Sequence, residues 1–89
     1  MKLGSLKEGG RDGTLIVVSR DLSRAVKATG IAPTLQRALE DWDTLAPRLA
    51  TVYEVLETSP AETINGEPVF ALDMAALAAP LPRAYEFVD

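Results

Sequence analysis

The chain has 89 residues, of which 47% are hydrophobic and 25% are charged, and it contains neither cysteine nor histidine. This length allows one domain with a modest core, and the composition is typical of a folded globular protein rather than a disordered one. The two missing residue types exclude disulfides, thiolate metal sites, cysteine nucleophiles, Ser–His–Asp catalysis and imidazole acid–base chemistry.

The net charge of −4 is unevenly distributed along the chain. Residues 1–30 hold six basic and three acidic side chains, whereas residues 31–89 hold three basic and ten acidic ones. The acidic part is mostly the predicted helical region, and the basic part has no aromatic residue for base stacking, so we expect no nucleic-acid partner. No apolar run reaches the ~20 residues that span a bilayer, and the first residues do not form a signal peptide, so we expect a cytoplasmic protein with no membrane partner.

The first third of the chain predicts a small antiparallel sheet. An alternating segment at residues 2–6 and a β-branched run at 15–18 flank a glycine-rich connection, which is typical of a hairpin with a loop longer than two residues. The four consecutive apolar residues of the second segment favour a strand that is covered on both faces. Asp21 and Ser23 are expected to hydrogen-bond their own backbone in a second turn, before a short third strand at 24–28.

The middle of the chain predicts two amphipathic helices. Pro33 suits the first helical position of the first helix, and Thr34 could instead serve as its N-cap. Apolar residues then recur with helical spacing in two stripes. The stripes are Leu35, Ala38, Leu39 and Trp42, followed by Leu45, Leu49, Val52, Tyr53 and Leu56.

Pro47 lies close to the point where the second stripe follows the first, between Leu45 and Leu49. A proline inside a helix removes one backbone hydrogen bond and clashes with the preceding turn, at a cost of ~3 kcal/mol. We therefore predict a break at residues 43–45, with Asp43 or Thr44 capping the second helix and Pro47 in its first turn.

The last third of the chain shows no clear period. The Asn-Gly pair at 65–66 indicates a turn, the apolar segment at 69–72 has no clear type, and Asp73 can cap a short turn after it. Prolines then favour an extended tail. We expect an α+β fold, with a small sheet packed by two helices over residues 1–78 and an extended proline-rich junction at 79–89.

Several groups of residues could carry chemistry, and each is better explained as structure. The glycine-rich loop precedes a β run rather than a helix, which favours a plain turn over a phosphate cradle. Trp42 and Tyr53 lie on apolar stripes and are expected in the core, while Arg20 and Arg24 are interpreted as surface residues or partners of an interdomain ion pair. The acidic residues of the helices lie on polar faces and are interpreted as solvated surface rather than a cation site: Glu40, Asp41, Asp43, Glu54 and Glu57. We therefore expect no catalytic, metal or cofactor site in this chain.

Four segments, taken in order, resemble the N-terminal domain of bacterial fumarylacetoacetate-hydrolase-family proteins: residues 18–26, 31–36, 39–42 and 79–85. The resemblance covers nearly the whole chain. It implies a small sheet-and-helix domain that precedes a catalytic domain. In that family the catalytic domain holds a divalent metal, usually magnesium, through acidic residues and hydrolyses or decarboxylates compounds with adjacent oxo groups. None of those metal ligands would lie in this chain.

The resemblance also implies a role for the end of the chain. The junction into the catalytic domain would contain Pro80, Leu81, Pro82, Arg83 and Tyr85. The chain would then be an accessory domain of a hydrolase, with the catalytic domain as its partner, present here as a truncation or as a product that lost its enzyme. The alternative is a free-standing interaction module, since a chain of this length can fold alone.

Apolar residues of the last third are expected at the surface when the domain stands alone. A contiguous apolar patch on a small protein marks an interface, so we expect the isolated chain to self-associate. The candidate residues are Val69, Phe70, Leu72, Leu77, Leu81, Tyr85, Phe87 and Val88.

Overall fold

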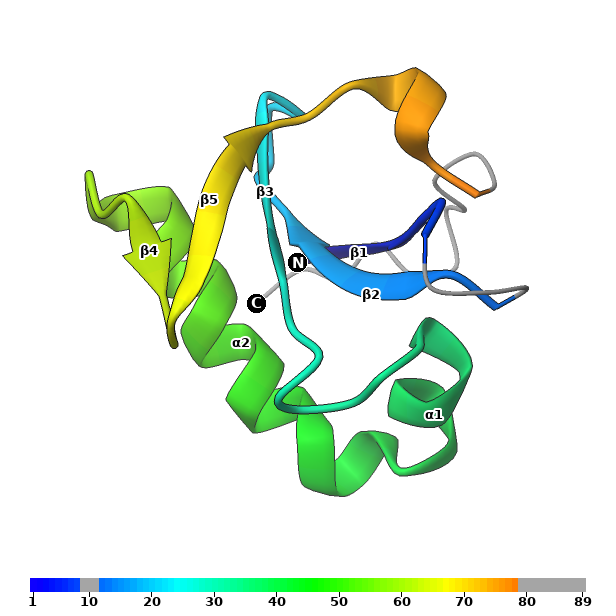
Figure 1. Ribbon diagram of the computed structural model, residues 1–89. Coiled ribbons are helices and arrows are strands. Elements are labelled where there is room, and N and C mark those ends of the chain that lie inside the picture. Colours follow the sequence, from blue (N-terminus) through cyan, green and yellow to red (C-terminus); the bar gives the residue numbers. More distant parts are fainter. Residues whose placement is uncertain (9–11, 79–89) are drawn as a thin grey trace.

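A five-stranded antiparallel sheet forms the centre of the molecule, and two helices pack on one of its faces (Figure 1). The computed structural model describes residues 1–8 and 12–78. The strands are β1 (Lys2–Leu6), β2 (Thr14–Val18), β3 (Arg24–Lys27), β4 (Thr63–Ile64) and β5 (Glu67–Ala71), the helices are α1 (Leu35–Glu40) and α2 (Trp42–Thr58), and η1 (Met74–Ala76) is a 3-10 helix. The strand order β1-β2-β3-β5-β4 places β5 beside β3. This confirms the predicted α+β class and adds two strands to the predicted sheet.

β2 is an inner strand of the sheet, between β1 and β3. All of its residues are buried, because both of its faces are covered. Leu15 and Val17 belong to the cluster on the helix side, whereas Ile16 and Val18 belong to a second cluster on the opposite face. The run of apolar residues in this strand therefore reflects a sheet with two buried faces, as predicted.

The helices contribute their predicted apolar stripes to the core on one face of the sheet. The buried residues of α2 are Leu45, Leu49, Val52 and Leu56, and that of α1 is Ala38. They pack against buried residues of β1, β2 and β3. Trp42 and Tyr53 are half-buried and pack against this core, so they lie at its margin rather than at its centre.

The break between the helices is confirmed, but it lies at Asp41, before the predicted residues 43–45. Asp41 has φ −126° and ψ 40°, which is not helical, and both Asp43 and Thr44 lie inside α2. Pro47 is also inside α2. The missing N–H of Pro47 leaves the Asp43 carbonyl without a helical donor, but both residues are exposed, so water can satisfy that oxygen.

The segments of unclear type after α2 complete the sheet. Asn65 and Gly66 have φ values of 53° and 82°, the left-handed conformation that a two-residue hairpin turn between β4 and β5 requires. The apolar segment that follows is β5. Asp73 then caps η1, since its Oδ1 accepts a hydrogen bond from the Ala75 N–H at 2.9 Å. The predicted turn and the predicted cap are both confirmed.

The last described residues return to the edge strand β1. The Ala78 N–H donates to the Ser5 carbonyl at 2.7 Å, and the Lys7 N–H donates to the Ala76 carbonyl at 2.8 Å. The predicted junction at 79–89 lies outside the described residues. Over the part of the chain that the structure describes, no helix combines the length and apolar character that crossing a bilayer demands.

Candidate functional site

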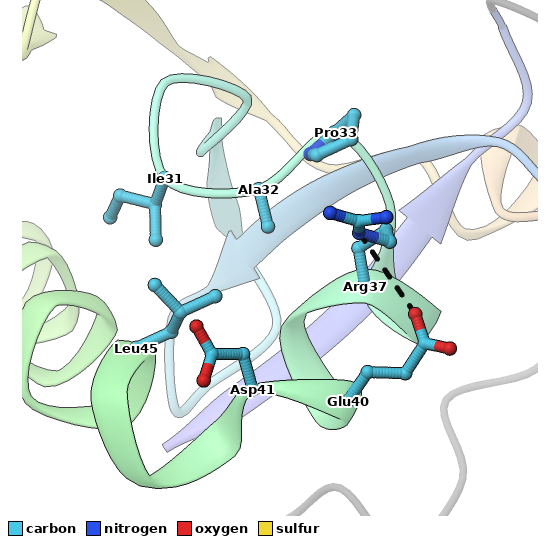
Figure 2. A pocket seen from close by; sticks show the side chains of 7 residues that line it. All are labelled: Ile31, Ala32, Pro33, Arg37, Glu40, Asp41 and Leu45. Atoms are coloured by element: carbon cyan, nitrogen blue, oxygen red, sulfur yellow. Dashed lines mark ion pairs between the residues drawn. The ribbon is translucent and has the colours of Figure 1, made fainter.

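An open hollow of about 450 Å³ lies where the loop after β3 meets the junction of α1 and α2 (Figure 2). Its lining residues are Ile31, Ala32, Pro33, Arg37, Glu40, Asp41 and Leu45. Two of the segments that carry the family resemblance, residues 31–36 and 39–42, therefore meet at this hollow. The sequence does not indicate that these segments form one site, because the loop and the helix junction meet only through tertiary packing.

The floor of the hollow is apolar and continuous with the core. Ala32 and Leu45 are buried, and the half-buried Ile31 packs against the same cluster. In Figure 2 the side chain of Leu45 points up toward Ile31 and Ala32. The loop is held in place by its backbone, because the Leu15 N–H of β2 donates to the Pro33 carbonyl at 3.2 Å.

The short helix α1 forms the rim. Thr34 is its N-cap, and the Thr34 side chain accepts a hydrogen bond from the Arg37 N–H at 3.2 Å. This decides between the two predicted openings of the helix in favour of Thr34. α1 ends at Glu40, and Arg37, Glu40 and Asp41 all line the hollow. In Figure 2 the Asp41 carboxylate lies beside Leu45, whereas the Glu40 carboxylate points toward Arg37.

The charges on this rim are only loosely paired. The Nε of Arg37 lies 3.9 Å from the Oε1 of Glu40, and the two side chains are 72% and 58% exposed. Such a pair contributes ~0–1 kcal/mol. Asp41 is the N-cap residue of α2, yet its carboxylate makes no cap hydrogen bond. The rim thus carries two carboxylates and one guanidinium, and both acids are exposed, as predicted.

A second hollow of about 300 Å³ lies between the end of β3, α2 and the β4–β5 turn. Lys27, Arg48 and Glu67 are its charged lining residues. The Lys27 ammonium pairs with the Glu8 carboxylate, and this hydrogen bond raises the pKa of Lys27. The charge of Lys27 is therefore already matched within the chain, which makes this hollow the weaker candidate for a ligand.

The turn between β2 and β3 is organised by one carboxylate. Asp21 Oδ1 accepts hydrogen bonds from the Ser19 hydroxyl at 2.8 Å, the Ser23 hydroxyl at 2.6 Å and the Ser23 N–H at 3.0 Å. The bonds from Ser23, then that from Ser19 and the nearby charge of Arg24, lower the pKa of Asp21 to about 2. This confirms the predicted backbone hydrogen bond of the Asp21 side chain, whereas the Ser23 hydroxyl bonds to the Asp21 carboxylate and not to the backbone.

The same turn holds the C-terminal end of α2. The backbone N–H of Arg20 donates to Glu57 Oε1 at 2.5 Å, and the half-buried Arg24 guanidinium donates to the Leu56 carbonyl. Arg20 is on the surface, as predicted, whereas Arg24 has a structural partner within the domain. Glu57 is exposed, as predicted, but its carboxylate also accepts this hydrogen bond and so has a structural role. The sequence gives no signal for these contacts because 37 and 32 residues separate the partners.

The described residues do not fit a catalytic metal. Residues 1–8 and 12–78 contain no group of three or more acidic side chains that could hold a metal ion. Every buried side-chain nitrogen or oxygen in that part of the chain has a hydrogen-bond partner, so no orphaned polar group there marks the place of a ligand. The predicted junction residues, from Pro80 to Tyr85, lie outside the described residues.

Comparison with protein-family models gives a match over most of the chain. The family model described as fumarylacetoacetase N-terminal domain 2 matches residues 1–83. No curated protein matches the chain. The matched region includes the sheet, both helices and the candidate hollow, and it is nearly the whole sequence. The chain therefore belongs to the fumarylacetoacetase N-terminal domain 2 family.

Proposed function

We propose that this chain is the accessory N-terminal domain of a fumarylacetoacetate-hydrolase-family enzyme and that it is not catalytic on its own. The family match over residues 1–83 is the observation that supports this role. The chemistry belongs to a catalytic domain of the same enzyme. By the family resemblance, that domain uses a divalent metal, usually magnesium, to hydrolyse or decarboxylate acylpyruvate-type compounds with adjacent oxo groups.

The side chains of this domain support a role without chemistry. The sequence offers no histidine and no cysteine for acid–base or nucleophilic work. Glu40 and Asp41 are the carboxylates at the candidate hollow, and both are exposed. A carboxylate that acts as a catalytic acid or base is usually desolvated or coupled to another charge. The domain contributes contact surface and orientation instead.

Two measurements test this proposal. The first is the mass of the native gene product, which should be well above the 9.5 kDa of this chain. A native product of only 9.5 kDa would overturn the accessory role and favour a free-standing interaction module. The second is turnover of acylpyruvates by the purified chain, with and without magnesium, next to a full-length family enzyme as positive control. We expect none; activity that copurifies with the chain would contradict the proposal.

Self-association of the isolated chain belongs to the same proposal. Leu77 is buried and cannot contribute, which corrects the sequence-based candidate list, while Val69, Phe70 and Leu72 are half-buried. The other candidates lie outside the described residues. Met74, 49% exposed, is the exposed large apolar residue in the described part of the chain. Sedimentation of the full chain and of a variant lacking 81–89 tests the idea: both remaining monomeric at high concentration would refute it.

A further inference from the structure

We infer that Asn65, in the turn between β4 and β5, is a site of spontaneous deamidation, where the folded chain converts asparagine to aspartate or isoaspartate. The nucleophile is the backbone nitrogen of Gly66, and the other reactant is water. Asn65 is the asparagine of this sequence that precedes a glycine, and the sequence holds no other asparagine. Nothing in this chemistry depends on the proposed accessory role.

The reaction needs no cofactor and no change of oxidation state. The Gly66 nitrogen, after losing its proton to hydroxide, attacks Cγ of the Asn65 side chain. A bond forms between that nitrogen and Cγ, the Cγ–Nδ2 bond breaks, and the amide leaves as ammonia with a proton from water. The resulting succinimide then adds water at one of its two carbonyl carbons. Addition at Cγ gives aspartate, and addition at the backbone carbonyl carbon gives isoaspartate.

The structure leaves both reacting groups open. Asn65 and Gly66 are exposed, and within the described residues no hydrogen bond holds the Asn65 side chain or the Gly66 N–H. Apart from its chain neighbours, no atom lies within 4 Å of the position that a Gly66 Cβ would occupy. Glycine also has no side chain of its own to hinder the approach of the nitrogen to Cγ.

Ring closure requires the tip of the turn to open. The Gly66 nitrogen reaches Cγ only after rotation about the Cα–C bond of Asn65, which takes the pair out of the hairpin geometry. Little resists this rotation, because β4 has two residues and lies at the edge of the sheet. The next bond away from the turn joins the Val69 N–H to the Glu62 carbonyl at 2.8 Å. An exposed turn held by so few backbone bonds opens at far less cost than the whole domain.

The chain contains an internal comparison. Asp12 precedes Gly13, and an aspartate before glycine can form the same succinimide with loss of water. Gly13, however, is buried, and an added Cβ there would lie 2.8 Å from the Leu6 carbonyl oxygen. The backbone at Gly13 therefore has little room to rotate. We expect isoaspartate to accumulate at residue 65 of the folded chain and not at residue 12.

The two products affect the turn differently. Aspartate keeps the backbone unchanged and tolerates the left-handed φ of 53° at this position. Isoaspartate adds one carbon to the backbone, so a two-residue turn can no longer keep β4 and β5 in register. Both products place a carboxylate at the hollow of about 300 Å³. Arg48 lines that hollow and has no ion pair within the described residues, so it is the cation available to the new charge.

Mass spectrometry of the purified chain tests the inference. The chain is incubated at mildly alkaline pH, either folded or unfolded in urea, and peptide mapping follows the conversion of amide to acid at residue 65. The same maps give the isoaspartate content at residues 12 and 65. We expect the folded chain to lose its amide no more than about tenfold more slowly than the unfolded chain, since the turn opens locally.

Two variants separate the chemistry from its consequence. Gly66→Ala should slow the reaction in both the folded and the unfolded chain, because a Cβ hinders the attacking nitrogen. Asn65→Asp introduces the carboxylate on a normal backbone, so this variant should unfold at nearly the same urea concentration as the fresh parent. The aged parent, in contrast, should contain a fraction that unfolds at lower urea, and that fraction should carry isoaspartate.

Defined results would overturn the inference. A folded chain that keeps its amide, or that loses it more than about tenfold more slowly than the unfolded chain, would show that the turn protects Asn65. Equal isoaspartate at residues 12 and 65 of the folded chain would show that the structure does not select this turn. An aged parent as stable as the fresh one would refute the effect on strand register. The mass of the native product is unaffected by any of these outcomes, so the accessory role is tested separately.

Discussion

The two faces of the sheet are buried by different kinds of structure. On one face, α1 and α2 lay regularly spaced side chains over β1, β2 and β3. On the other, a smaller cluster joins strand residues to η1. Its buried members are Leu6, Ile16, Val18, Ala25 and Leu77, with Leu22, Phe70, Leu72 and Ala76 packed against them. The helix face is built from repeating elements, whereas the second face is built from irregular ones.

Leu22 shows what an irregular element requires. Its φ of 65° lies in the left-handed region, which costs a residue with a side chain about 1–2 kcal/mol. The side chain packs against the second cluster, and the Leu22 N–H donates to the Ser19 carbonyl at 3.0 Å. These contacts offset the strain. One face of the sheet therefore depends on the helical period of its side chains, and the other depends on local backbone conformation.

The largest expected effect is on the helix face. Leu49 is fully buried in the middle of α2, so Leu49→Ala should remove about 2–5 kcal/mol from the free energy of unfolding. That loss is a large part of the ~5–15 kcal/mol of a small domain. Urea unfolding followed by circular dichroism measures it.

Leu77→Ala is the matched change on the second face. Leu77 is also buried but belongs to the smaller cluster at the β1 edge, where neighbours can relax, so we expect a loss of about 2 kcal/mol, the lower end of the range for such changes. Trp42→Ala should likewise cost less than Leu49→Ala, because Trp42 is half-buried. If Leu77→Ala lowers the free energy of unfolding as much as Leu49→Ala or more, the second face is no more tolerant of a lost side chain than the helix face.

The sequence is sufficient where period or residue chemistry determines structure locally. The apolar run of β2, the stripe from Leu45 to Leu56, the cap at Asp73 and the turn at Asp21 were all predictable, because each depends on neighbours within a few residues. The hairpin turn at Asn65 was predictable for the same reason. These features account for the strands of the first third and for the helix face of the core.

The sequence is insufficient where distant segments meet. Pro47 predicts a break at residues 43–45, but the helix tolerates this proline and the break lies at Asp41, because Asp43 and Pro47 are exposed and water can reach the carbonyl that Pro47 leaves without a donor. The pairing of β5 with β3 and the contact of Arg24 with α2 join residues far apart in the chain. The candidate hollow could not be predicted at all, because its floor and rim come from a loop and a helix junction that share no sequence pattern.

Three glycines test the role of backbone conformation. Gly13 has φ +71°, and an added Cβ would lie 2.8 Å from the Leu6 carbonyl oxygen, so Gly13→Ala should cost about 2–4 kcal/mol from strain and overpacking together. Gly66 has φ +82° and open space around it, so Gly66→Ala should cost only the strain, about 1–2 kcal/mol. Gly30 has open space and no positive φ, so Gly30→Ala should be neutral or slightly stabilising. The reverse order in thermal unfolding would contradict this view of the turns.

A smaller effect is expected where the turn holds α2. Glu57→Ala removes the acceptor for the Arg20 N–H and should lower the free energy of unfolding by about 0.5–1 kcal/mol. Glu54→Ala is the control, because Glu54 is also exposed on α2 and has no such acceptor role in the described part of the chain. It should change stability by less than ~0.5 kcal/mol. Equal losses from both changes, measured by urea unfolding, would show that the contact is not stabilising.

The smallest effect links the second face to pH. The pKa of Asp21 is about 2 in the folded chain, below its usual 3.8, because Ser23 and Ser19 donate to the charged carboxylate. A lowered folded-state pKa stabilises the fold above the unfolded pKa, and this contribution is lost as the pH falls from about 4 toward 2. In Asp21→Asn this pH-dependent part is absent, so the stability difference between parent and variant should be full at pH 5 and shrink by pH 2. Urea unfolding at several pH values measures that difference.

Ser23→Ala should raise the pKa of Asp21 in an NMR titration, because it removes the hydroxyl donor. Since this turn carries Leu22 onto the second cluster, amides near Val18 should lose hydrogen-exchange protection in acid before those near Leu49 do; simultaneous loss would mean that the turn and the second face are not coupled.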